Sequence, residues 1–94
     1  MDDGFRDPAD NTTMTKSEFK ALMAEAEARC GISHRPHYCE GYVRGLRRLY
    51  HGPHFGNLQD HEEWLGWAWD ERDKDKADRG RGYLDGLQGM RPQI

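Results

Sequence analysis

The chain has 94 residues, enough for one domain but not for two separate hydrophobic cores. Charged residues make up 33% of it and hydrophobic residues 35%, and the mean hydropathy is −1.09, so the folded surface must be very polar. A net charge of −3 gives no overall bias toward nucleic acid or membranes. No apolar run approaches the roughly 18–20 residues that a membrane span needs, so we expect that the chain does not cross a membrane.

The buried area must come largely from aromatic side chains. The sequence holds three Trp, four Tyr and three Phe, and each large aromatic side chain buries on the order of 150–250 Å². Aliphatic residues are few, so we expect modest stability, or support from a partner protein, a second copy in a homodimer, or a metal. The N-terminus is acidic where a secretion signal would be basic, which favours a cytoplasmic protein with Cys30 and Cys39 as free thiols.

The first half of the chain predicts an arm followed by two helices. Residues 1–14 lack an apolar period and read as a flexible arm, so the single helical domain covers 15–94. A capping box formed by Thr15 and Glu18 predicts a helix over 16–30, which we expect to end in a Schellman motif at Gly31. Pro36 suits the first turn of a second helix over 36–51.

The second half predicts two more helices and no convincing strand. Asn57 is a good N-cap for a third helix that frays near residue 73, and a fourth helix closes at residue 89. Set out at 100° per residue, Trp69 falls on the buried face of the third helix, Trp64 at its edge and Trp67 outside it. We therefore predict a compact all-α domain of four helices with short connections.

A short phrase occurs twice, 41 residues apart: Gly41-Tyr42-Val43-Arg44-Gly45-Leu46 and Gly82-Tyr83-Leu84-Asp85-Gly86-Leu87. In each copy the two glycines are four apart, so they share one helix face. Glycine in a helix costs roughly 0.5–1 kcal/mol relative to alanine, and close packing of two backbones would explain why it is kept. We predict that the second and fourth helices pack on each other through these glycines. The repeat is explained either by two diverged helical hairpins or by chance.

The tryptophan-rich stretch is the first candidate binding site. Three tryptophans in six residues cannot all face one core, and an exposed Trp flanked by charge is typical of an interaction hot spot. The candidate partner-binding residues are Trp67, Trp64, Glu63, Asp70 and Glu71. The alternative is that Trp67 packs beneath Phe5 of the arm and that the carboxylates only solubilise the surface.

Two further clusters offer alternative functions. Arg44, Arg47 and Arg48 would give a small nucleic-acid-binding regulator a basic helix, unless they are a solvated face paired with the acidic third helix. Four possible zinc ligands lie within ten residues: Cys30, His34, His37 and Cys39. A bound zinc would stabilise a thin core, although the spacing differs from that of paired knuckle sites.

No catalytic arrangement is visible in the sequence. No Ser or Cys lies in a nucleophile elbow, and no Glu accompanies a pair of histidines at helical spacing. His61 falls on the apolar face of the third helix, where a neutral, hydrogen-bonded histidine is the usual outcome. We therefore expect a non-enzymatic protein without a cofactor.

Roughly residues 40–88 of the chain resemble small orphan proteins of proteobacterial phages and prophages. The residues that carry this resemblance are Gly41-Tyr42-x2-Gly45-Leu46, His51-Gly52-x2-Phe55-Gly56, His61-x2-Trp64-Leu65 and Arg79-Gly80-Arg81-Gly82-Tyr83-x2-Gly86-Leu87. The resemblance implies a small, compact, non-enzymatic inhibitor of host defence, such as an anti-CRISPR protein. Its partner would be a host protein or nucleoprotein complex in the host cytoplasm. The resemblance carries over no individual site residue and does not include the first helix.

Overall fold

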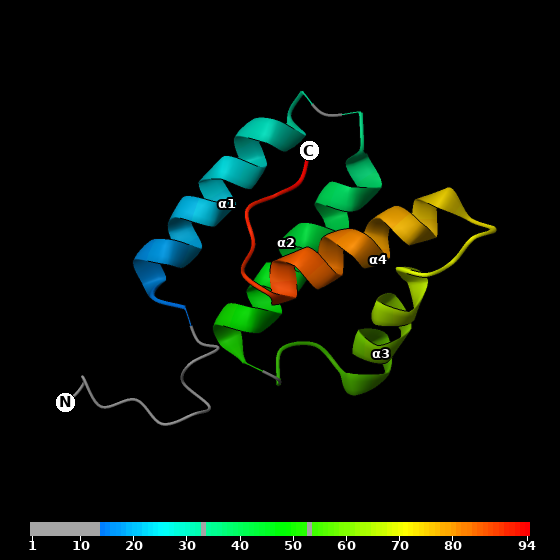
Figure 1. Ribbon diagram of the computed structural model, residues 1–94. Helices are drawn as coiled ribbons and strands as arrows, with labels where there is room; N and C mark the ends of the chain where they lie inside the picture. Colours follow the sequence, from blue (N-terminus) through cyan, green and yellow to red (C-terminus); the bar gives the residue numbers. More distant parts are fainter. Residues whose placement is uncertain (1–13, 33, 53) are drawn as a thin grey trace.

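The computed structural model describes residues 14–32, 34–52 and 54–94, and these residues form four α-helices and no strand. This confirms the predicted all-α, four-helix architecture (Figure 1). The helices are α1 (Lys16–Cys30), α2 (Pro36–His51), α3 (Leu58–Trp67) and α4 (Lys74–Leu87). Most of the predicted arm, including Phe5, lies outside the described residues. Its last residue, Met14, packs against the core.

The helix starts follow the capping residues in the sequence. The Thr15 backbone N–H donates to Glu18 Oε1 over 2.8 Å, and the Glu18 N–H donates to Thr15 Oγ1 over 3.1 Å, as the predicted capping box requires. Asn57 accepts from the Asp60 N–H and so caps α3. The expected Schellman motif at the end of α1 is wrong, because Gly31 has a φ of −63° rather than a left-handed conformation.

Helices α2 and α4 cross at the centre of the molecule and touch through their backbones. A Cβ built at Gly41 would overlap the carbonyl oxygen of Arg79, and one at Gly45 would overlap that of Tyr83. The glycines of α4 likewise lie against the backbone of α2, because a Cβ at Gly82 would overlap the carbonyl oxygen of Tyr38. The predicted glycine-mediated packing is confirmed.

The contacts at this crossing are reciprocal. Gly41 faces the backbone of residues 79 and 83, while Gly82 faces that of residues 38 and 42, so each contact recurs with both partners shifted by 41 positions. The flanking helices follow the same scheme, since α1 contacts α2 and α3 contacts α4. This arrangement is two helical hairpins facing each other through equivalent surfaces. This reciprocity favours two diverged helical hairpins over chance as the origin of the repeat.

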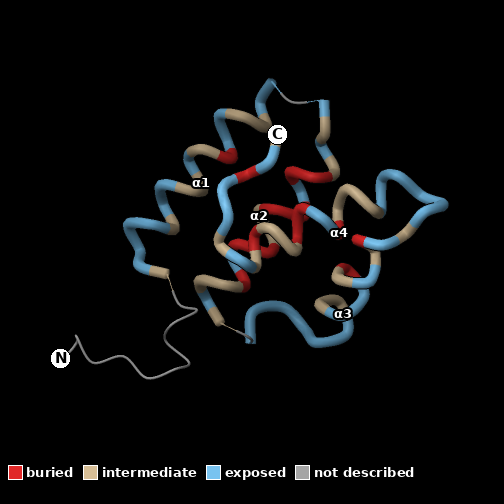
Figure 2. Tube along the Cα trace, viewed as in Figure 1, coloured by how far each residue is buried: buried red, intermediate tan, exposed pale blue. Residues whose placement is uncertain are grey.

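The core lies beneath this crossing, where Figure 2 shows the buried residues gathered on α2 and α4. The residues that form its centre are Ala26, Tyr38, Tyr42 and Leu46. Two of them satisfy their hydroxyl groups on the C-terminal segment: Tyr42 Oη donates to the Met90 carbonyl over 2.6 Å, and the Gln93 N–H donates to Tyr38 Oη over 2.9 Å. Burial raises the pKa of Tyr42 to about 12.

The C-terminal segment, residues 88–94, runs back between α1 and α2 (Figure 1). The Arg91 guanidinium binds the Glu25 carboxylate of α1 at 2.7 Å, and Arg29 donates to the Ile94 carbonyl over 3.2 Å. The hydrogen bond and charge of Arg91 lower the pKa of Glu25. Helix α1 is thus held on its own chain by this segment.

A disulfide between Cys30 and Cys39 also ties α1 to α2, with Cα atoms 5.9 Å apart. The expectation of free thiols is therefore wrong. The two helix ends meet because the short turn after Gly31 reverses the chain, and the sequence spacing alone did not indicate this approach. Within the described ranges no helix is both long and apolar enough to cross a membrane.

Candidate functional site

The connection between α3 and α4 is short, and hydrogen bonds fix its backbone at both ends. After α3 ends at Trp67, the Asp70 N–H donates back to the Trp67 carbonyl over 2.9 Å. The Asp70 carboxylate accepts from the Arg72 and Asp73 N–H groups over 2.8 and 2.9 Å, and these bonds lower its pKa. Asp73 in turn caps α4 by accepting from Asp75 and Lys76 N–H groups. The backbone around Trp69 is therefore held in one shape by local hydrogen bonds.

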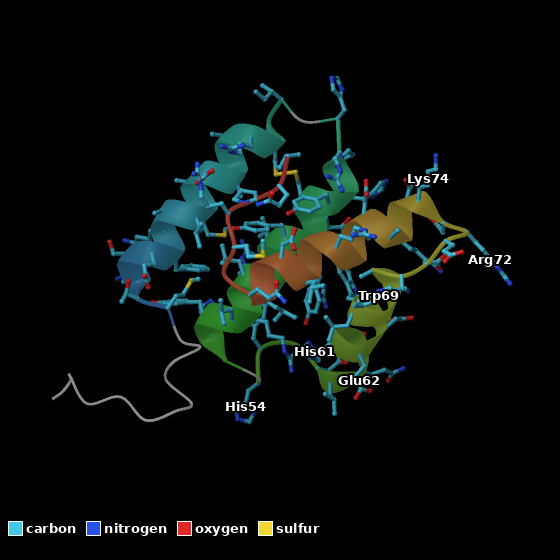
Figure 3. All side chains as sticks on the ribbon, in the orientation of Figure 1. His54, His61, Glu62, Trp69, Arg72 and Lys74 are labelled. Carbon is cyan, nitrogen blue, oxygen red and sulfur yellow. A yellow bond between two sulfur atoms is a disulfide. The ribbon has the colours of Figure 1, made fainter. Side chains whose placement is uncertain are left out.

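Trp69 lies on this connection (Figure 3), and 69% of it is exposed. The prediction that Trp69 is buried is wrong. Helix α3 ends before residue 69, so the 100° periodicity no longer applies there. The preceding residue, Ala68, is buried, because Gly80 of α4 lets the backbone of Trp67 and Ala68 approach directly.

The other two tryptophans, predicted to bind a partner, lie mainly inside the protein. Trp64 is buried, with its ring centroid 5.8 Å from that of Tyr83 and the Arg44 guanidinium 4.7 Å above it. Trp67, predicted to be exposed, is half-buried against Trp64, and the Lys76 ammonium lies 5.6 Å from its ring centroid. Both rings therefore contribute to the packing of α3 against α4.

Carboxylates dominate the surface of α3 and the connection after it. Residues 58–73 hold six Asp or Glu residues and one Arg. Glu62, Glu63 and Glu71 are exposed and form no ion pair with any residue of the described ranges. Asp60 pairs with Arg44, and Asp70 is engaged by backbone N–H groups. The predicted site residues Glu63 and Glu71 are thus free to meet a partner, whereas Asp70 shapes the loop.

The three arginines of the nucleic-acid alternative do not form one exposed surface. Arg48 is only 8% exposed and donates to the Phe55 carbonyl over 2.8 Å. Arg44 pairs with Asp60 at 3.3 Å. Of the three, Arg47 alone is exposed without an ion pair in the described part of the chain. A single available guanidinium is a weak basis for binding a phosphate backbone.

The zinc alternative loses two of its four ligands to the disulfide. Cys30 and Cys39 bond to each other, so neither can supply the thiolate that zinc needs. Among residues 14–32, 34–52 and 54–94, no three His, Cys, Asp or Glu side chains are grouped so that they could hold a metal. His37 lies instead 3.4 Å from the Asp75 carboxylate of α4.

His61 takes the role expected from its place in the sequence. It is half-buried, and its Nδ1 lies 2.7 Å from Tyr83 Oη. Burial, followed by the nearby charge of Arg48, lowers the pKa of the imidazole. A neutral ring that shares a hydrogen bond with a buried tyrosine joins α3 to α4.

Comparisons with protein-family models, with curated proteins and with solved structures found no match to this chain. The functional argument therefore rests on the surface of the molecule itself. Its most distinctive feature is one large, exposed aromatic side chain, Trp69, on a connection that its own hydrogen bonds hold in place.

Proposed function

We propose that the protein is a non-enzymatic binding protein that docks onto a cationic surface of its partner through Trp69 and the acidic face of α3. The observation that carries this proposal is the 69% exposure of Trp69 on the tied connection. A polar protein with few aliphatic residues gains nothing in its own stability from leaving this side chain in water. Exposed tryptophans at fixed positions are typical anchors of protein interfaces.

The energetics of such an anchor are favourable. Burying about 150 Å² of the indole at about 25 cal/mol per Å² yields roughly 4 kcal/mol. The backbone around it is already ordered, so binding costs less conformational entropy than it would for a mobile loop. Glu63 and Glu71 add long-range attraction to a basic surface, which increases the association rate more than the affinity.

A basic groove that normally holds nucleic acid fits this chemistry. An acidic protein surface with an aromatic anchor can occupy such a groove and exclude the nucleic acid. We therefore propose the anti-CRISPR type of activity, in which the partner is a host nucleoprotein complex, as the form of this function to test first. The resemblance to small phage proteins supports this choice of partner.

The experiment compares two variants that each remove one exposed apolar side chain, Trp69→Ala and Ile32→Ala. Ile32 is 83% exposed after the end of α1, away from α3, and is the matched control. Wild-type protein is titrated against purified CRISPR effector complexes, and binding is measured as co-migration on native gels. A pull-down from bacterial lysate with quantitative mass spectrometry covers other partners. We expect Trp69→Ala to weaken binding at least about 30-fold, the size of a hot-spot loss, and Ile32→Ala to change it little. If every partner is retained equally by Trp69→Ala, the assignment of the anchor is wrong.

A further inference from the structure

A second surface, on the opposite side of α2, is independent of the Trp69 site. A groove of about 600 Å³ runs along the face of α2 that is turned away from α4. Cys39 and Val43 on its floor lie two residues from Gly41 and Gly45, which puts them across the helix from the α4 contact. The groove is walled by α1 on one side and by the segment leading into α3 on the other. Its apolar lining includes Ala26, Cys30, Cys39, Val43, Phe55 and Trp64.

The two hairpins differ at one equivalent position beside the groove. On α4, Gly80 lets the backbone of Trp67 and Ala68 lie directly against the helix. The residue 41 positions earlier is Cys39, which is bonded to Cys30 of α1. Both cysteines line the groove together with Val43.

The charged residues that line the groove are not all neutralised. Arg44 pairs with Asp60, and Glu40 with Arg79. Arg47 on α2 and Glu27 on α1 line the groove, are exposed, and have no ion-pair partner in the part of the chain that the structure describes. The groove thus offers one uncompensated cation and one uncompensated anion beside an apolar floor.

The dimensions fit a helix. The floor extends along α2 from Pro36 to Arg47, about 16 Å at 1.5 Å per residue, which is three helical turns. A helix laid there packs on α1 and α2 in the same way that helices pack on one another elsewhere in the fold. A single small anion would pair with Arg47 but leave Glu27 uncompensated, whereas a helix can carry both signs of charge.

We infer that this groove binds an amphipathic helix of a partner protein, with its apolar face on Val43 and Phe55, an acidic side chain toward Arg47 and a basic one toward Glu27. The recognition would follow the helix-in-groove mode, in which apolar residues at i, i+4 and i+7 act as anchors. The uncompensated charges set the direction in which the helix lies. This inference uses neither Trp69 nor the acidic face of α3, so it stands or falls separately from the proposed function.

The probe is a displayed library of helix-forming peptides of about 15 residues, selected against the full, oxidised chain. Selected peptides are synthesised, and their affinities are measured by fluorescence anisotropy for wild type, Arg47→Glu and Arg81→Glu. Arg81 is the matched control, because it is also exposed without an ion pair among the described residues but lies on α4. Neither arginine contributes to the buried core, so both variants should keep the wild-type melting temperature.

We expect binders with apolar anchors at helical spacing and an acidic residue, weakened at least about tenfold by Arg47→Glu and unaffected by Arg81→Glu. Replacing the peptide's acidic residue by lysine should restore binding to Arg47→Glu. The inference is overturned if no binder emerges, if Arg47→Glu binds as tightly as wild type, or if Trp69→Ala abolishes binding.

Discussion

The glycine contacts between α2 and α4 predict that the same substitution, Gly→Ala, lowers the stability of the fold at Gly45 and raises it at Gly66. In Gly45→Ala the added Cβ would overlap the Tyr83 carbonyl oxygen and lie 2.9 Å from the Tyr83 carbonyl carbon and 3.0 Å from the Leu87 nitrogen. All three atoms are backbone, so no side chain can rotate away and the helices must separate. Overpacking of this kind costs about 1–3 kcal/mol, and the separation also reduces the burial of Tyr42 and Leu46. The gain in helix propensity, roughly 1 kcal/mol, offsets only part of this.

We expect Gly45→Ala to lower the free energy of unfolding by about 2 kcal/mol net, equivalent to a fall in melting temperature of about 8–16 °C for a domain of this size. The control is Gly66→Ala, since a Cβ at Gly66 meets nothing within 4 Å. There the helix propensity acts alone, and the variant should be more stable by about 0.5–1 kcal/mol. Both values come from thermal and urea unfolding followed by circular dichroism. If Gly45→Ala is stabilised as much as Gly66→Ala, backbone contact does not hold α2 and α4 together.

Three further predictions concern the elements that surround this crossing. Replacing Cys30 and Cys39 by serine should lower the free energy of unfolding by about 2.5 kcal/mol, the loop-closure entropy of the short loop between them. A reductant should lower the melting temperature of the wild type but not that of the variant. Tyr42→Phe should cost about 1 kcal/mol in urea unfolding, because it removes the hydrogen bond that the Tyr42 hydroxyl donates to the Met90 carbonyl. An unchanged midpoint would contradict that bond. The pKa of His61 is below its ordinary 6.5 in the fold, so the unfolded chain takes up its proton first and stability should fall as the pH drops below about 6.5. His61→Asn should remove that part of the pH dependence.

The sequence predicted the parts of the fold that depend on local rules. The capping box at Thr15, the proline start of α2 and the glycine faces of α2 and α4 act through neighbouring residues or one helix face, and the structure contains all three. The disulfide and the return of the C-terminal segment along α1 depend on contacts between distant residues. No local pattern encodes them.

The exposed tryptophan was missed for a related reason. The 100° periodicity places Trp69 on the buried face only if the helix continues through it, and Asp70 and Asp73 are the kind of turn and cap residues that end one helix and begin the next. Together these two residues indicate that α3 ends earlier and that Trp69 lies in the connection to α4. Ala68, by contrast, falls on the face that the periodicity predicts to be buried, and it is buried because Gly80 of α4 lets the backbone approach.

The reciprocal contacts of α2 and α4 have a consequence for how the chain reaches its native state. Helices α2 and α4, one from each hairpin, share the largest contact between any two described helices, and the segment after α4 accepts a hydrogen bond from the Tyr42 hydroxyl. A chain that has made only its first hairpin would leave Tyr42 and Leu46 uncovered on the side where α4 belongs. The polypeptide should therefore fold and melt as one cooperative unit, with a single transition shared by every helix.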